Sequence, residues 1–95
     1  MIFGRVAGTV VLTQRADQVP GAKFLLVEAC TPRQEGRGEY VVALDVVGAG
    51  EGELVMVAQG PSARNTCVSD RRSIDAVICG IVDLVEERGA VVYRK

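Results

Sequence analysis

The amino-acid sequence predicts an all-β fold, a small barrel assembled from short strands. Hydrophobic residues make up 48% of the 95-residue chain, yet only two Phe and two Tyr are aromatic, so valine and other aliphatic residues must fill the core. Branched aliphatic side chains suit the pleated surface of a sheet. The eleven glycines are typical of tight turns between strands. Closing such strands into a barrel leaves no sheet edge exposed.

Four strands are expected in the first two thirds of the chain, separated by turn-forming segments. The expected strands are Ile2–Thr13, Lys23–Ala29, Tyr40–Val46 and Glu53–Ala58. The first connection ends in Pro20-Gly21, which is a strong signal for chain reversal. Residues 31–38 contain a proline, two glycines and three charged residues and are expected to form an exposed hairpin loop. Residues 61–65 are expected to form one short helical turn.

The last quarter of the chain has two interpretations that periodicity leaves open. The apolar residues of segment 74–85 recur at the i, i+3, i+4, i+7 spacing of an amphipathic helix. The same segment is rich in β-branched residues and contains Gly80, and a glycine weakens a helix by about 1 kcal/mol relative to alanine. A turn and a plain strand follow at residues 89–93.

Composition and charge indicate a single cytoplasmic domain covering residues 1–95. Eleven basic and twelve acidic side chains give a net charge of −1, which provides no basic surface for nucleic acid. No apolar run is long enough to span a bilayer, and the first residues lack the pattern of a secretory signal. The three cysteines are odd in number and far apart, as expected of reduced thiols.

The residue types needed for catalysis are scarce, and the chain is expected not to be an enzyme. It has no histidine, hence neither the commonest general base nor the commonest metal ligand. Asp45, Asp75 and Asp83 lie in or beside apolar segments, where hydrogen bonding is the simpler role. Cys79 is interpreted as a small buried hydrophobic residue. The glycine-rich segment 48–52 leads into a strand and not a helix, so it is not a dinucleotide loop. No catalytic residue, cofactor or metal site is predicted.

A small barrel also suggests a module that binds nucleic acid or another ligand. Such a barrel needs stacking aromatic residues beside a positive groove. The aromatic residues here are widely separated along the chain: Phe3, Phe24, Tyr40 and Tyr93. We keep a small OB-like binding module as the alternative function.

Several motifs, taken in order, resemble the EutN/CcmL family of bacterial microcompartment vertex proteins over nearly the whole chain. The most specific is Ala43–Glu53, which is similar to the family's D-x-V-G-A-G-x-G-E signature. Gly8–Val11 resembles the opening strand. The residues Gly60, Ser62, Ala63 and Arg64 resemble a G-S-x-A-R turn, from which the inserted Pro61 departs. Two further stretches, Ser73–Ile78 and Gly80–Asp83, resemble the closing part of the family pattern.

The resemblance implies both a fold and an assembly. The fold is a five-stranded, OB-like closed barrel with one short helix and a C-terminal β-hairpin, in which Ala76–Val85 is a strand paired with Val91–Arg94. The assembly is a cyclic homopentamer that caps the five-fold vertices between hexameric tiles in the shell of a cytoplasmic microcompartment. Neither nucleic acid nor a membrane is an expected partner.

The resemblance also implies where neighbouring subunits meet. The glycine-rich segment 48–52, called the glycine loop below, is expected to allow close packing at the subunit junction, with Asp45 orienting it. Arg64, Asp75 and Asp83 are expected to offer charged or hydrogen-bonded contacts between subunits. The expected interface residues are Asp45, Gly48, Ala49, Gly50, Gly52, Arg64, Asp75 and Asp83.

Overall fold

The protein consists of β-strands throughout the part described by the computed structural model, residues 1–12, 23–60 and 76–95. The strands are β1 (Ile2–Val10), β2 (Lys23–Cys30), β3 (Gly36–Asp45), β4 (Leu54–Gln59), β5 (Ala76–Ile81), β6 (Leu84–Glu87) and β7 (Ala90–Arg94). The helical turn expected at 61–65 lies outside the described residues. Segment 76–81 is a strand, so the helical interpretation of that part is wrong.

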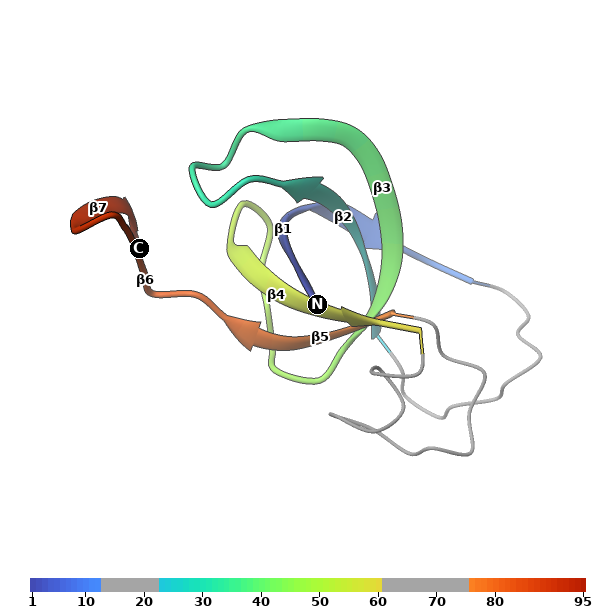
Figure 1. Ribbon diagram of the computed structural model, residues 1–95. Coiled ribbons are helices and arrows are strands. Elements are labelled where there is room, and N and C mark those ends of the chain that lie inside the picture. Colours follow the sequence, from blue (N-terminus) through green and yellow to red (C-terminus); the bar gives the residue numbers. More distant parts are fainter. Residues whose placement is uncertain (13–22, 61–75) are drawn as a thin grey trace.

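Five of these strands form a closed barrel with the order β1-β2-β3-β5-β4, and β4 pairs back onto β1 (Figure 1). The predicted five-stranded closed barrel is therefore confirmed. Neighbouring strands are antiparallel except β3 and β5, which run parallel. Over the described residues this parallel seam has only two residue pairs, Leu44 with Val77 and Asp45 with Ile78.

The barrel interior is filled by small and branched aliphatic side chains, as the composition predicts. Alternate residues of each strand point inward. The buried cluster consists of Val6, Leu25, Val27, Ala43, Ala49, Val55, Val57, Ala76 and Ile78. Each fully buried valine or isoleucine contributes about 1.5–3 kcal/mol relative to an exposed one, so these side chains are the main source of stability.

Gly4 is a buried position of β1 with no room for a side chain. A Cβ atom at this position would collide with Cγ1 of Val27 on β2. At Gly8, on the same strand, a Cβ atom would meet nothing within 4 Å. The first glycine is therefore required by packing, and the second is not.

Several strand boundaries differ from the predicted ones, most of them by one residue and three of them by more. β1 ends at Val10 although Val11 and Leu12 are apolar, and β3 begins at Gly36 because the exposed residues that follow still pair toward β2. The expected strand Ala76–Val85 is interrupted at residues 82–83, where the Val82 N–H donates to the Leu54 carbonyl (2.9 Å).

The two halves of that expected strand belong to different sheets. β5 pairs with β4 and β3, and only the last part, β6, pairs with β7. The expected pairing with Val91–Arg94 is thus wrong for β5. It is right for β6, where Leu84 and Val85 lie opposite Arg94 and Tyr93. The β6–β7 hairpin projects from one end of the barrel (Figure 1), and its two-residue turn has positive φ at Arg88 and Gly89.

The glycines of β1 provide a matched test of the packing. We expect Gly4→Ala to lower the free energy of unfolding by about 1–3 kcal/mol because Val27 must move. Gly8→Ala should leave stability unchanged or raise it slightly, since glycine carries an entropic cost in a strand. Urea unfolding of both variants measures the difference, and equal stabilities would contradict the packing role of Gly4.

Candidate functional site

The longest loop among the described residues joins β3 to β4 and carries most of the predicted interface residues. Asp45 ends β3, and Gly48, Ala49, Gly50 and Gly52 lie in the loop. Asp83 lies exposed between β5 and β6. The remaining two, Arg64 and Asp75, lie outside the described residues.

The Asp45 carboxylate holds this loop in place from within the chain. Its Oδ1 accepts hydrogen bonds from the N–H groups of Val47 (3.1 Å), Gly48 (3.1 Å) and Ala49 (3.2 Å), and its Oδ2 accepts a further one from Ala49 (3.1 Å). The Asp45 side chain is 1% exposed. On its outer side, Lys23 Nζ lies 3.5 Å from Oδ2 and donates to the Ala49 carbonyl (3.3 Å). The carboxylate is therefore engaged inside its own subunit.

The loop residues differ in why they are small. Gly48 and Gly52 have φ of 77° and 87°, a left-handed conformation that costs other residues roughly 1–2 kcal/mol. Ala49 is buried in the core cluster, so its side chain fills the barrel end. Gly50 is exposed and has no such φ, and a Cβ there would make only an ordinary contact with Glu53. Its own chain therefore does not explain the glycine at position 50.

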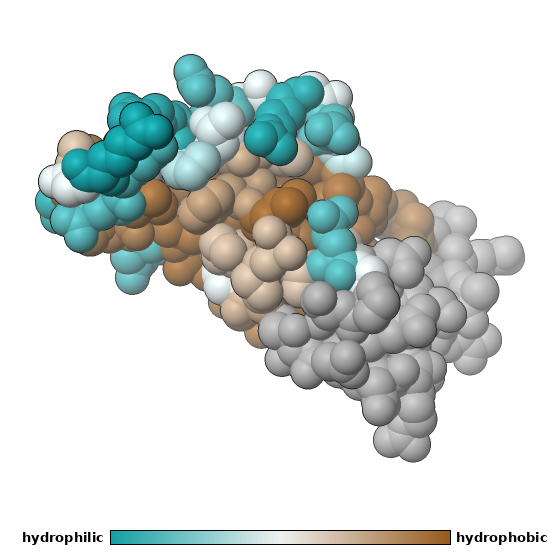
Figure 2. All heavy atoms as spheres, in the orientation of Figure 1, coloured by the Kyte–Doolittle hydropathy of each residue, from teal (hydrophilic) through white to brown (hydrophobic). Residues whose placement is uncertain are grey.

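Large apolar side chains are exposed at several places around the closed barrel. Val46 and Val47 of the loop are 46% and 38% exposed. On the outer face of β3, Tyr40 and Val42 are 56% and 46% exposed. Figure 2 shows hydrophobic residues as a band along the middle of the visible face, with hydrophilic residues gathered above it and at the hairpin end. Exposed apolar surface of this kind is typical of proteins that associate.

Glu53 links the glycine loop to the C-terminal hairpin. Its Oε1 accepts a hydrogen bond from the Gly50 N–H, and its Oε2 lies 2.9 Å from Lys95 Nζ. The Lys95 contact, followed by the Gly50 hydrogen bond, holds the pKa of the Glu53 carboxyl below its usual value. The resulting stabilisation is present above the ordinary glutamate pKa and is lost as the pH falls through the lowered one.

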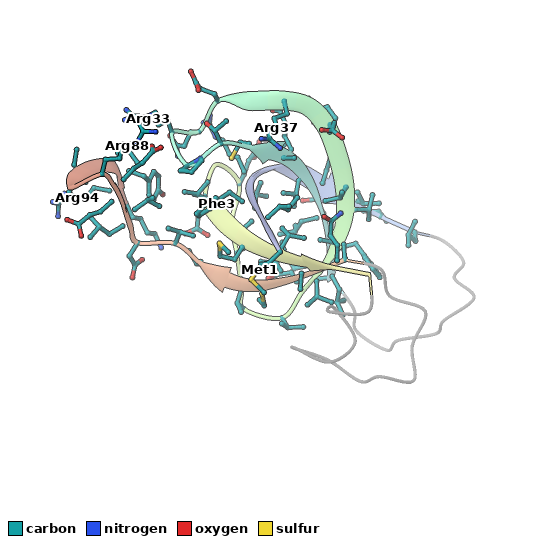
Figure 3. All side chains as sticks on the ribbon, in the orientation of Figure 1. Met1, Phe3, Arg33, Arg37, Arg88 and Arg94 are labelled. Carbon is teal, nitrogen blue, oxygen red and sulfur yellow. The ribbon has the colours of Figure 1, made fainter. Side chains whose placement is uncertain are left out.

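One further contact closes the hairpin at its base, and another links it to the loop after β2. The Lys95 N–H donates to the Asp83 carbonyl (2.9 Å), and Arg33 Nε lies 3.3 Å from Glu87 Oε1. Figure 3 shows Arg33, beside the turn after β2, near Arg88 at the hairpin tip. Sequence reasoning did not single out Glu53, although the glutamate at the end of the loop signature was the available signal.

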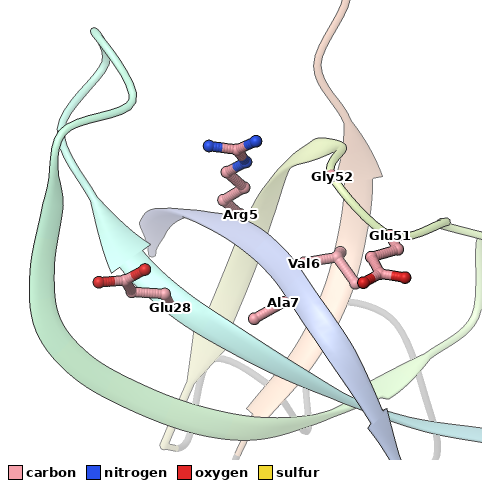
Figure 4. Close-up of a pocket in the computed structure, with 6 residues that line it drawn as sticks. All are labelled: Arg5, Val6, Ala7, Glu28, Glu51 and Gly52. Atoms are coloured by element: carbon pink, nitrogen blue, oxygen red, sulfur yellow. The ribbon is translucent and has the colours of Figure 1, made fainter.

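A cavity of about 240 Å³ opens on the outer face of β1 (Figure 4). It is lined by Arg5, Val6, Ala7, Glu28, Glu51 and Gly52. It lies where the β1–β2 register shifts between Val6 and Gly8 and where the Gly52 N–H donates to the Val6 carbonyl (2.8 Å). Sequence reasoning missed this cavity, because its charged residues come from three separate segments.

The cavity and its surroundings offer charge recognition and no evident reaction chemistry. Among the described residues, no group of three or more His, Cys, Asp or Glu side chains is placed to hold a metal ion. Cys30 is buried, and burial raises the pKa of its thiol. Cys79 is only half-buried, with its Sγ 3.6 Å from the Met56 carbonyl. In the described part of the chain there is no helix with the length and apolar character to cross a membrane.

Comparison with known proteins matches residues 1–83 to the family described as ethanolamine utilisation protein EutN/carboxysome. The carboxysome shell vertex protein CcmL of Gloeobacter violaceus is 40% identical over 100% of this chain and 95% of its own length. The microcompartment shell vertex protein GrpN of Rhodospirillum rubrum is 44% identical over 90% of this chain and 97% of its own length.

Solved structures of the same two relatives share the fold. The Gloeobacter violaceus CcmL structure aligns with a TM-score of 0.91 at 40% identity and covers 100% of this chain and 98% of that one. The GrpN structure, described as a pentameric microcompartment shell protein, aligns with a TM-score of 0.81 at 42% identity and covers 92% of this chain and 100% of that one.

Removing the Asp45 carboxylate tests its hold on the loop. We expect Asp45→Ala to lower the free energy of unfolding by about 1.5–3 kcal/mol, because hydrogen bonds to a charged group are lost and loop N–H groups lose their acceptor. Asp83→Ala, at an exposed carboxylate, is the matched control and should change stability by less than about 0.5 kcal/mol. Chemical denaturation followed by circular dichroism compares the two, and equal losses would contradict the role assigned to Asp45.

Proposed function

The chain belongs to the EutN/CcmL family, and on that premise we propose that it is a structural subunit of a bacterial microcompartment shell. In this proposal five copies form a closed ring that caps a five-fold vertex between hexameric tiles. The observation that carries it is the match to shell vertex proteins over the full chain, at 40% identity and a TM-score of 0.91. The ring lies in the cytoplasm, within the shell.

The closed barrel supports an assembly in which subunits meet through side chains and not by pairing of strand edges. The barrel strands pair with one another around a closed circle, while apolar side chains remain exposed on β3 and the glycine loop. A cyclic ring needs two different surfaces that meet head to tail and close after a fixed rotation. A sheet of flat hexameric tiles can close into a shell only if five-fold rings occupy its corners. The proposed function is to supply the shape of such a corner.

A structural role is also supported by what the sequence offers chemically. The whole chain has no histidine, and its relatives CcmL and GrpN are described as shell vertex proteins. We infer that the protein is not an enzyme and that its cavity serves contact.

Within the glycine loop, Gly50 is the position we assign to the subunit junction. Gly48 and Gly52 are accounted for by their backbone angles, Asp45 by its bonds to the loop, and Ala49 by its burial. Gly50 is exposed beside the apolar Val46 and Val47, and its lack of a side chain leaves room for a neighbour. Asp83, exposed at the base of the hairpin, remains a candidate contact.

Native mass spectrometry tests the ring directly. We expect the purified protein to be a five-subunit species, whereas a monomer with salt-sensitive affinity for oligonucleotides would support the alternative binding module.

A size series at Gly50 tests the junction. We expect Gly50→Leu to keep a folded barrel but to weaken each subunit contact by about 1–3 kcal/mol, because the added side chain overpacks the interface. Gly50→Ala should have a smaller effect. Intact pentamers of the leucine variant at every dilution would refute the packing role of Gly50 and leave the vertex function standing.

A further inference from the structure

The C-terminal hairpin is a separate sheet that its own barrel covers only in part. Over the described residues, β6 and β7 pair with each other and with no barrel strand. An isolated two-stranded hairpin is at best marginally stable in water. The described contacts that tie it to the barrel side run through Lys95 and Glu87.

One exposed face of this hairpin carries both apolar and charged side chains. Residues directly opposite in an antiparallel pair share a face. The register therefore places Leu84 with Arg94, and Glu86 with Val91, on one face. Leu84 and Val91 are 45% and 44% exposed, and the Arg94 guanidinium makes no hydrogen bond or ion pair with the described residues. Figure 3 shows Arg94 at the end of the molecule farthest from the barrel.

The cavity on β1 has an excess of the charge opposite to that of the Arg94 guanidinium. Its lining contains the carboxylates of Glu28 and Glu51 and one guanidinium, that of Arg5. Over the described residues Glu51 has no hydrogen-bond or ion-pair partner, and Glu28 accepts only a 3.3 Å hydrogen bond from the Gly38 N–H. The cavity therefore has an excess of negative charge and an unused acceptor.

An apolar row lies beside that charged row, with Val42 46% exposed and Leu26 half-buried. The β1–β2–β3 register places Glu28 between Arg5 and Tyr40, and places Leu26 opposite Val42 on the same outer face. The hairpin face and this barrel face therefore share a pattern, an apolar pair next to charges of both signs. The hairpin carries Arg94 and Glu86, and the cavity carries Glu28 and Glu51 with Arg5.

We propose that the exposed hairpin face of one subunit packs onto the outer face of β1–β3 of the next copy. The Arg94 guanidinium enters the neighbour's cavity between Glu28 and Glu51, and Leu84 and Val91 cover the neighbour's Leu26 and Val42. The two surfaces differ, as a head-to-tail contact requires. The inference rests on the proposed ring, in which every hairpin has a neighbour's cavity to fill.

Charge reversal tests the pair in the full-length protein. Arg94→Glu and Glu51→Arg should each raise the concentration at which the ring dissociates by about tenfold or more, because each places like charges in one cavity. The double variant should return to within about threefold of the wild type, since the pair is restored with its signs exchanged. Arg88→Glu, the same charge change at the hairpin tip, is the control and should leave the ring intact.

A second pair of variants tests the apolar part. Leu84→Ser should weaken the ring by about tenfold, whereas Val11→Ser, at a valine that is 85% exposed, should not. Circular dichroism and urea unfolding confirm that each variant retains its fold.

The outcomes separate this proposal from the proposed function. A wild-type protein that forms no ring would refute the vertex function. Wild-type rings together with intact rings of both single charge variants, or a double variant that fails to recover, would overturn the hairpin contact alone. Variants that form rings but no longer join a shell would also overturn it and assign the hairpin to a tile.

Discussion

The structure depends on one short seam, the two-residue parallel pairing that closes the barrel between β3 and β5. Asp45 belongs to that seam, and its carboxylate also binds the N–H groups of the loop that follows. The same residue therefore closes the barrel and starts the loop that leads to β4. Because only two residue pairs hold the seam over the described residues, its strength depends on the buried side chains of Leu44, Val77 and Ile78 on the two strands. The Asp45 carboxylate stabilises the loop that follows the seam.

Hydrophobic pattern and the family signature predicted the barrel, its aliphatic core and the hairpin, because these follow from which residues must avoid water. They did not predict where pairing stops. Val11 and Leu12 are as apolar as a strand yet lie beyond β1, whereas the exposed residues from Gly36 onward pair because the chain turns back beside β2. The break at residues 82–83 was not predicted, because the chain passes there from the barrel to the hairpin sheet without a change in the hydrophobicity pattern.

The sequence correctly indicated which segment forms the candidate site, but not what each of its side chains does. The signature located the glycine loop, but backbone angles and burial distribute its residues among different tasks: Gly48 and Gly52 allow the turn, Ala49 fills the core, and Gly50 leaves open space. The cavity could not be predicted, since Arg5 and Glu28 meet only through the β1–β2 register, and Glu51 comes beside them only through the Gly52 N–H bond to the Val6 carbonyl. The spacing of these three residues along the sequence does not indicate that they lie close together.

The closed circle of strands also determines what happens to surplus copies. An open sheet edge recruits further strands and can grow into fibres without limit, and a protein needed only at corners is easily made in excess. Here the barrel offers no such template in its paired strands. The hairpin, which does have edges, is short, irregular between Val85 and Glu86, and charged. Unused subunits therefore have a route to small closed assemblies and a poor one to amyloid-like growth.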